Sequence, residues 1–164
     1  MNRIKYRAIT QACLTEAILD RMEELELRCG LEPYSRDMLR CCVETMENLG
    51  AFDGDQLVGF LTMGWTNAYC GGSLYLVNRN VEPEYRGRDL AKKLLYGKLR
   101  ERNPFFPGKL VSLDVTRSNR VRSLYQKLGF RKIDTPSRNG PEVVVMAAGV
   151  NHVLECLDTL RKEE

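Results

Sequence analysis

Hydrophobic and polar positions alternate along this chain in a way that predicts both strands and helices. Residues 3–9 alternate apolar and charged side chains, which predicts a strand of the kind found at sheet edges. Leu14, Ile18, Met22 and Leu25 recur at helical spacing, which predicts a helix over residues 11–28 with Thr10 before it. The other faces of that helix are expected to carry its acidic residues: Glu16, Asp20, Glu23, Glu24 and Glu26.

A second helix is predicted over residues 36–48, with Ser35 as its N-cap and Gly50 ending it. The dipeptide Asp53-Gly54 lies between apolar runs and predicts a hairpin within residues 50–65. The remaining expected elements are a strand at 73–82, a helix from near 89 to 102, a loop at 103–108, a strand at 109–115, a helix at 119–128, strands at 130–134 and 142–148, and a helix at 151–162.

The order β-αα-βββ-α-β-α-ββ, followed by a C-terminal helix, predicts a mixed α/β (α+β) domain. Its central sheet is expected to be mostly antiparallel and flanked by helices. The 164 residues fit one domain, and 43% hydrophobic with 29% charged residues is the composition of a soluble globular protein. The N-terminus has no signal-peptide pattern, and no apolar run approaches the roughly 20 residues of a membrane span. We therefore expect a cytoplasmic protein.

The six cysteines are scattered and form no CxxC pair, and the chain has a single histidine, His152. This pattern argues against a metal site and favours free thiols in a reducing compartment. Catalysis by a Cys–His pair is also disfavoured, because His152 is the only imidazole available.

Charge is distributed unevenly along the chain. Residues 1–78 hold 7 Lys/Arg and 11 Asp/Glu, a net charge of −4, whereas residues 79–132 hold 15 and 5, a net charge of +10. A basic middle indicates an anionic ligand, although solvated helix faces explain part of the excess. Because no aromatic run accompanies the basic residues, we do not expect nucleic-acid binding.

The stretch "VEPEYRGRDLAKKLLYGKL", residues 81–99, predicts a strand end, a polar turn and a helix. A helix N-terminus exposes unpaired N–H groups and partial positive charge, so it suits a phosphate. Gly87 allows close approach of a ligand to the backbone, and Arg86 and Arg88 add positive charge. The carboxylate of Asp89 is unexpected at such a place.

This stretch resembles the acetyl-CoA-binding turn of the GNAT superfamily of N-acyltransferases, Arg/Gln-x-x-Gly-x-Gly/Ala, from Arg86 to Ala91. Asp89 stands where that family usually has glycine. Residues 118–130, "SNRVRSLYQKLGF", resemble the family's later motif, Asn-x-x-(small)-x-x-Leu-Tyr-x-Lys-x-Gly-Phe. The matching residues are Asn119, Leu124, Tyr125, Lys127, Gly129 and Phe130, and Arg122 stands at the small position.

The resemblance implies a GNAT domain over residues 1–148, with residues 149–164 as a helical extension. It also implies acetyl-CoA as co-substrate, with pantetheine pairing with the backbone around Val81. The pyrophosphate would lie on the N–H groups of the turn residues Arg86, Gly87, Arg88, Asp89, Leu90 and Ala91. Tyr125 would protonate the leaving thiolate. Asn119 would bind the cofactor or order the start of its helix.

Each of these residues also has an ordinary structural interpretation. Tyr125 could be a half-buried packing residue, and Asn119 an N-cap. Asp89 could cap the helix and exclude the pyrophosphate, or it could point to solvent and leave only its backbone N–H for the phosphate. We favour the second alternative, and we expect Asp89 to weaken CoA binding modestly.

The acceptor side is less specific. Asn78, Arg79 and Asn80 place polar groups in a central strand, which suggests an active-site wall or ordered water. The alternative is that they lie where the strand already splays from its neighbour. Glu82 is a candidate base for the acceptor amine, although its neighbour Pro83 is consistent with an exposed position. In the family, the acceptor pocket includes the loop after the first helix and the turn after the third strand, here Glu32, Tyr34, Trp65, Asn67 and Tyr69.

The sequence thus predicts an acetyl-CoA-dependent N-acetyltransferase acting on the primary amine of a small molecule or peptide, without a metal. It leaves both a monomer and a homodimer open. The alternative is a non-catalytic GNAT-like module that binds acyl-CoA or another protein. Asp89 favours this alternative, and the motif around Tyr125 opposes it.

Overall fold

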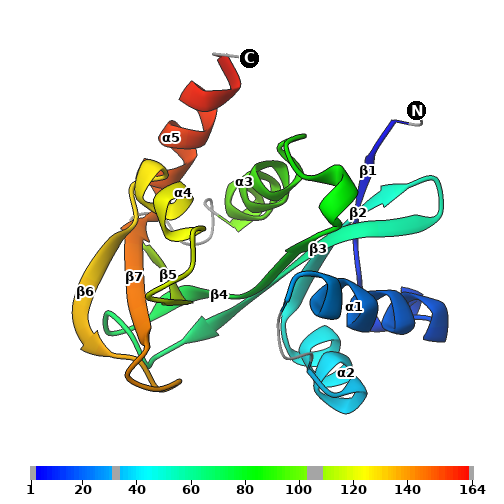
Figure 1. Ribbon diagram of the computed structural model, residues 1–164, viewed down its shortest axis with the longest axis horizontal. Coiled ribbons are helices and arrows are strands. Elements are labelled where there is room, and N and C mark those ends of the chain that lie inside the picture. Colours follow the sequence, from blue (N-terminus) through cyan, green and yellow to red (C-terminus); the bar gives the residue numbers. More distant parts are fainter. Residues whose placement is uncertain (1–2, 31–33, 103–108, 163–164) are drawn as a thin grey trace. The chain divides into compact units, whose positions relative to one another are not determined.

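The computed structural model describes residues 3–30, 34–102 and 109–162 (Figure 1). Its strands are β1 (Lys5–Ala8), β2 (Glu47–Asp53), β3 (Gln56–Thr66), β4 (Ser73–Val81), β5 (Leu110–Thr116), β6 (Arg131–Pro136) and β7 (Val143–Gly149). Its helices are α1 (Glu16–Arg28), α2 (Arg36–Thr45), α3 (Leu90–Arg102), α4 (Arg122–Lys127) and α5 (Val150–Lys162), with 3-10 turns η1 (Gln11–Cys13) and η2 (Pro83–Tyr85). The order of elements is the one that the sequence predicts. The predicted loop at 103–108 lies outside the described residues, as does Glu32.

The strands are hydrogen-bonded in the order β1-β2-β3-β4-β5-β7-β6. The pairs β1–β2, β2–β3, β5–β7 and β6–β7 are antiparallel. β4 and β5 are parallel, with register from Leu74↔Val111 to Leu76↔Leu113, because α3 carries the chain across between them. The mostly antiparallel sheet is therefore confirmed.

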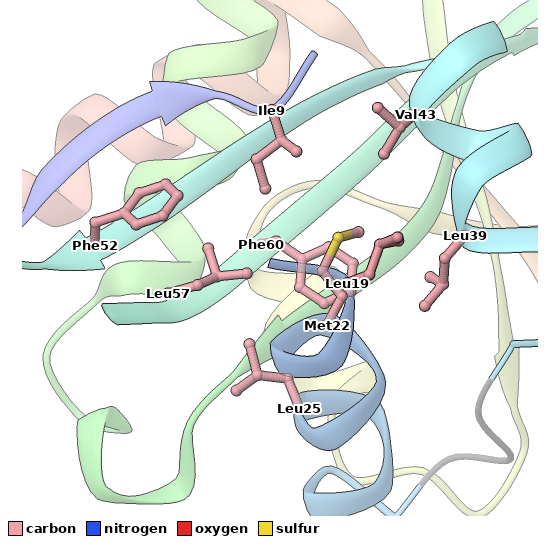
Figure 2. Close-up of a cluster of buried hydrophobic side chains, with 9 residues drawn as sticks. All are labelled: Ile9, Leu19, Met22, Leu25, Leu39, Val43, Phe52, Leu57 and Phe60. Atoms are coloured by element: carbon pink, nitrogen blue, oxygen red, sulfur yellow. The ribbon is translucent and has the colours of Figure 1, made fainter. Parts of the chain in front are cut away.

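The chain divides into two compact units. Unit 1 comprises Met1–Gly64 and Asn78–Leu95, and unit 2 comprises Trp65–Val77 and Tyr96–Glu164. In unit 1, helices α1 and α2 lie side by side (Figure 1). Their apolar faces meet β2 and β3 in the cluster shown in Figure 2, formed by Ile9, Leu19, Met22, Leu25, Leu39, Val43, Phe52, Leu57 and Phe60.

The core of unit 2 is built from the buried face of β5 and from β7, whose Val144, Val145 and Met146 are at most 3% exposed. Helix α5 follows β7 directly and buries Val150, Val153 and Leu157. No helix within residues 3–30, 34–102 and 109–162 is long and apolar enough to cross a membrane.

Three predicted helix boundaries are wrong. The first helix begins at Glu16 and not at residue 11, because the Thr15 side chain accepts a hydrogen bond from the Ile18 N–H and caps it. Thr10 precedes the short turn η1 instead. The second helix, capped by Ser35 as predicted, ends at Thr45.

That early end reflects sheet pairing. Residue Met46 has an extended backbone, and Glu47 and Asn48 pair with β3, so Gly50 lies within β2 and does not end the helix. The hairpin at Asp53-Gly54 is confirmed by the pairing of Asp53 with Gln56 and by the left-handed φ of 60° at Gly54. In the third case, α4 begins only at Arg122, three residues later than predicted.

Candidate active site

The turn ahead of α3 presents its backbone and two arginines to solvent. Gly87 and Asp89 have left-handed φ angles of 77° and 56°. A Cβ built on Gly87 meets nothing within 4 Å, so the positive φ is what favours glycine there. Arg86, Gly87 and Arg88 are all exposed. Backbone N–H groups around left-handed residues at a helix N-terminus form an anion-binding concavity, which the arginines reinforce.

Asp89 stands directly before α3, and its left-handed backbone explains why a glycine suits this position. Asp tolerates this conformation better than most residues with a Cβ. A usual N-cap has an extended backbone, which Asp89 lacks. Its carboxylate lies 2.6 Å from the Lys92 ammonium, on the first turn of the helix. The carboxylate is thus paired with a cation at the edge of the turn.

Both arginines of the turn are oriented by neighbours in unit 1. Arg86 Nη2 lies 3.7 Å from Cys29 Sγ at the end of α1. The Arg88 guanidinium lies over the Tyr85 ring, 4.9 Å from its centroid. The Tyr85 hydroxyl donates to Asp53 Oδ2 over 2.6 Å, and this hydrogen bond raises the pKa of Tyr85.

Glu82, the candidate base, is 3% exposed, so the expectation that it could be exposed beside Pro83 is wrong. Its carboxylate is paired with Arg21, and Arg28 Nε lies 2.7 Å from its Oε1. Burial raises the pKa of Glu82, and the two arginines act in the opposite direction. The Glu82 N–H donates to Val58 O, which ties the end of β4 to β3.

Asn78 and Asn80, predicted as an active-site wall, form a buried hydrogen-bonded chain with Glu26 of α1. Asn78 Nδ2 donates to Glu26 Oε1, and Asn80 Nδ2 donates to Asn78 Oδ1 over 2.6 Å. Glu26 is 1% exposed, so its expected place on a solvent face is wrong. Its other oxygen accepts a hydrogen bond from the Tyr34 N–H over 2.8 Å. The Tyr34 side chain itself is 38% exposed.

Burial of Glu26 makes stability depend on pH. Loss of hydration raises the pKa of this carboxyl above its usual 4.5, with the hydrogen bonds from Tyr34 and Asn78 acting in the opposite direction. The folded protein therefore holds this proton to a higher pH than the unfolded chain does. We expect the free energy of unfolding contributed by Glu26 to fall as pH rises from about 4.5 through the raised pKa.

Urea unfolding of the wild type and Glu26→Gln at several pH values tests this expectation. The difference in unfolding free energy between them should shift in favour of Glu26→Gln as the pH rises through that window. A difference that is independent of pH, or that moves the other way, would contradict a raised pKa at Glu26.

In unit 2, Tyr125 lies on α4, is 7% exposed and packs edge-to-face on Phe130, with ring centroids 5.5 Å apart. Asn119 precedes α4, and its Oδ1 accepts a hydrogen bond from the Val121 N–H over 2.9 Å. Asn119 therefore orders the start of the helical segment, one of its two expected roles. The family motif places its asparagine six residues before the leucine, whereas Asn119 lies only five residues before Leu124. The residue six positions before Leu124 is Ser118.

The three expected acceptor residues of unit 2, which are Trp65, Asn67 and Tyr69, have different surroundings. Trp65 is 46% exposed, and its indole N–H donates to Asn67 Oδ1 over 3.0 Å. Tyr69 is buried and donates its hydroxyl to Asp114 Oδ2 over 3.2 Å. The same carboxylate oxygen accepts from Ser137 and Asn139 on the β6–β7 loop, both over 2.6 Å. Asp114 therefore holds the β3–β4 and β6–β7 loops together.

Sequence reasoning missed Glu26, Arg21 and Asp114. Glu26 follows Met22 by four residues and Leu19 by seven, so the helical period could have placed it on the buried face of α1. Arg21 and Asp114 carried no such signal, because their partners are distant in the sequence. Among the residues that the structure describes, no group of three or more His, Cys, Asp or Glu side chains could hold a metal ion.

Comparison with known proteins agrees with this architecture. The family model described as "Acetyltransferase (GNAT) domain" matches residues 8–148. A [ribosomal protein bS18]-alanine N-acetyltransferase of Haemophilus influenzae is 32% identical over 139 residues, covering 78% of this chain and 90% of the relative.

Solved structures show the same fold. The ribosomal-protein-S18-alanine N-acetyltransferase of Escherichia coli has a TM-score of 0.71 at 20% identity, covering 90% of this chain and 94% of that one. NAA60 of Arabidopsis thaliana, in complex with a bisubstrate analogue, has a TM-score of 0.72 at 20% identity, covering 90% and 98%. Since the family model matches most of the sequence, the chain belongs to the GNAT family of N-acetyltransferases.

Proposed function

We propose that this protein transfers the acetyl group of acetyl-CoA to a primary amine, and that the acceptor is the N-terminal amine of a protein beginning with alanine. The observation that carries the proposal is the turn of Arg86–Asp89, with its two left-handed residues and exposed arginines ahead of α3. The relative at 32% identity, named for an alanine of a ribosomal protein, supports the acceptor class.

The residues of the turn fit the cofactor expected for the family. The N–H groups from Arg86 to Ala91 would hold the pyrophosphate, and nothing fills the space beside Gly87. The backbone of Val81 would pair with the pantetheine. The paired register between β4 and β5 ends at Leu76, so Val81 lies beyond the paired part of β4. Residues 1–148 would form the acetyltransferase domain, and residues 149–164 a helical extension.

The reaction needs two proton transfers. The amine nitrogen attacks the thioester carbonyl, the new C–N bond forms, and the C–S bond breaks. The thiolate takes a proton from the Tyr125 hydroxyl, while the amine loses its proton to a base or water. Glu82 is the candidate base. Its two arginine partners oppose that role, because a carboxylate shared by guanidinium groups is a weak proton acceptor.

Asp89→Gly tests the contribution of the carboxylate in the turn. We expect the dissociation constant of CoA to fall several-fold, because a negative charge beside the pyrophosphate is removed. Stability should also rise by about 1 kcal/mol, since glycine adopts the left-handed backbone without strain. Loss of the partly exposed ion pair with Lys92 offsets only part of that gain.

Calorimetry and urea unfolding measure the two effects, and Asp89→Asn is the matched variant. It removes the charge while keeping a side chain that tolerates φ > 0, so it should tighten CoA binding without the gain in stability. An unchanged CoA dissociation constant in both variants would show that Asp89 does not weaken binding.

Acetyl-CoA binding and turnover test the function as a whole. Calorimetry on the wild type should show binding, and a synthetic peptide beginning with alanine should release free CoA thiol and gain an acetyl group, detected by mass spectrometry. Binding without turnover of any amine would favour the non-catalytic module. Absence of acetyl-CoA binding would contradict the proposal.

A further inference from the structure

The hydrogen-bonded chain of unit 1 has a fixed direction. Glu26 accepts from Asn78 Nδ2 at one oxygen and from the Tyr34 N–H at the other. Asn78 thus turns its amide nitrogen toward Glu26 and its oxygen toward Asn80, whose Nδ2 donates to it. Each amide points its nitrogen toward the carboxylate. The free end of the chain is therefore the amide oxygen of Asn80.

That oxygen is buried and accepts no hydrogen bond from the residues that the structure describes. The Asn80 side chain is 0% exposed. A buried polar atom without a partner costs free energy, and an amide oxygen can be satisfied only by a donor. Any group that satisfies this oxygen must therefore carry an N–H or O–H donor.

Glu26, at the other end of this hydrogen-bonded chain, determines which kind of donor Asn80 favours. Hydrogen bonds in series polarise one another, so the negative charge of Glu26 makes Asn80 Oδ1 a stronger acceptor. A positively charged donor gains most from such an oxygen. Asn80 also directly precedes Val81, whose backbone is proposed to pair with the pantetheine.

We propose that Asn80 Oδ1 accepts a hydrogen bond from the primary amine of the acceptor, and that Glu26, acting through Asn78, is a positioning residue for Asn80. The proposal rests on the proposed function and adds to it the group that recognises the amine. The chemical class of the ligand is a primary ammonium or amine, and a permanently resident water is the competing occupant.

A titration with two small cations of equal charge distinguishes an amine from a resident water at Asn80. The full-length, 15N-labelled protein is titrated with ethylammonium, which carries N–H donors, and with tetramethylammonium, which carries none. The side-chain amide signals of Asn80 and Asn78 are followed by NMR. We expect a saturable shift with ethylammonium and none with tetramethylammonium. Equal shifts, or no shift with ethylammonium, would overturn the proposal, the latter leaving only a buried water.

Variants add a second readout, although the two cations decide the matter on the wild type alone. Asn80→Leu removes the acceptor oxygen at similar volume and should abolish the ethylammonium response of Asn78. Asn48→Leu is the matched control, because Asn48 is also buried in unit 1 but bonds to Cys42, Met46 and Thr62. It should keep the response. A response retained in Asn80→Leu would overturn the proposal.

Glu26→Gln tests the positioning role. Removing the charge should weaken ethylammonium binding several-fold while the protein still discriminates against tetramethylammonium, and unchanged affinity would remove Glu26 from the proposal. The titration is made with and without CoA. Failure to bind CoA would contradict the proposed function, whereas the ethylammonium response reports on Asn80 independently.

Discussion

Replacing Tyr125 with phenylalanine is expected to lower kcat for acetyl transfer by about 100-fold or more, with little change in the dissociation constant of acetyl-CoA. The substitution removes one hydroxyl and keeps the ring, so the edge-to-face packing on Phe130 and the buried position on α4 should persist. Without a proton donor the thiolate must leave as an anion, which raises the barrier of the chemical step. Steady-state kinetics with the alanine-initiated peptide, together with calorimetry, measure the two quantities.

Tyr6→Phe is the matched control, because Tyr6 is a half-exposed tyrosine on β1 without a proposed role. Its kcat should match that of the wild type. If Tyr125→Phe retains full kcat, Tyr125 is not the acid, and its burial reflects packing alone. A fall in kcat accompanied by a comparable loss of stability would likewise indicate a packing role.

The second large effect concerns stability. Glu82→Ala is expected to lower the free energy of unfolding by about 3 kcal/mol, because it removes the buried carboxylate that pairs with Arg21 and leaves that guanidinium only the half-exposed Glu24 and the Leu57 carbonyl as partners. The Glu82 side chain is 4% exposed and that of Arg21 13%. Arg28, at 39% exposed, can turn to water and contributes less to the loss. Urea unfolding at neutral pH measures the change.

Glu84→Ala is the control for this second effect. Glu84 also pairs with Arg28, but its side chain is 62% exposed, so its loss should cost no more than about 1 kcal/mol. Similar losses for both variants would show that burial does not set the strength of the Glu82 pairs.

Glu82→Gln then separates the ion pair from a role in catalysis. A base at Glu82 would make kcat/KM rise with pH as this carboxyl loses its proton, and the glutamine variant would lose that dependence. A purely structural Glu82 would change stability and leave the shape of the pH profile intact.

The predictions that the structure confirms most closely concern elements that are predicted from residues close together in the sequence. Helix α3 follows from the regular spacing of Leu90, Leu94, Leu95 and Leu99, all at most 3% exposed. The β2–β3 hairpin follows from one dipeptide that favours a tight turn. Helix ends were harder to predict. The end of α2 is decided by the pairing of Glu47 and Asn48 with β3, a contact that helical periodicity in the sequence does not contain.

For the candidate site, the sequence alone determined the turn of Arg86–Asp89, the polar strand around Asn78 and Asn80, and the motif around Tyr125. These are contiguous stretches whose residue types suffice to suggest their chemistry. Only the tertiary structure decided what these residues contact. It placed Glu26 at the end of the Asn78–Asn80 chain and Arg21 on Glu82, partners 52 and 61 residues apart in the sequence. Hydrophobic burial brings such residues together, and a buried polar group then requires a partner that local sequence cannot name.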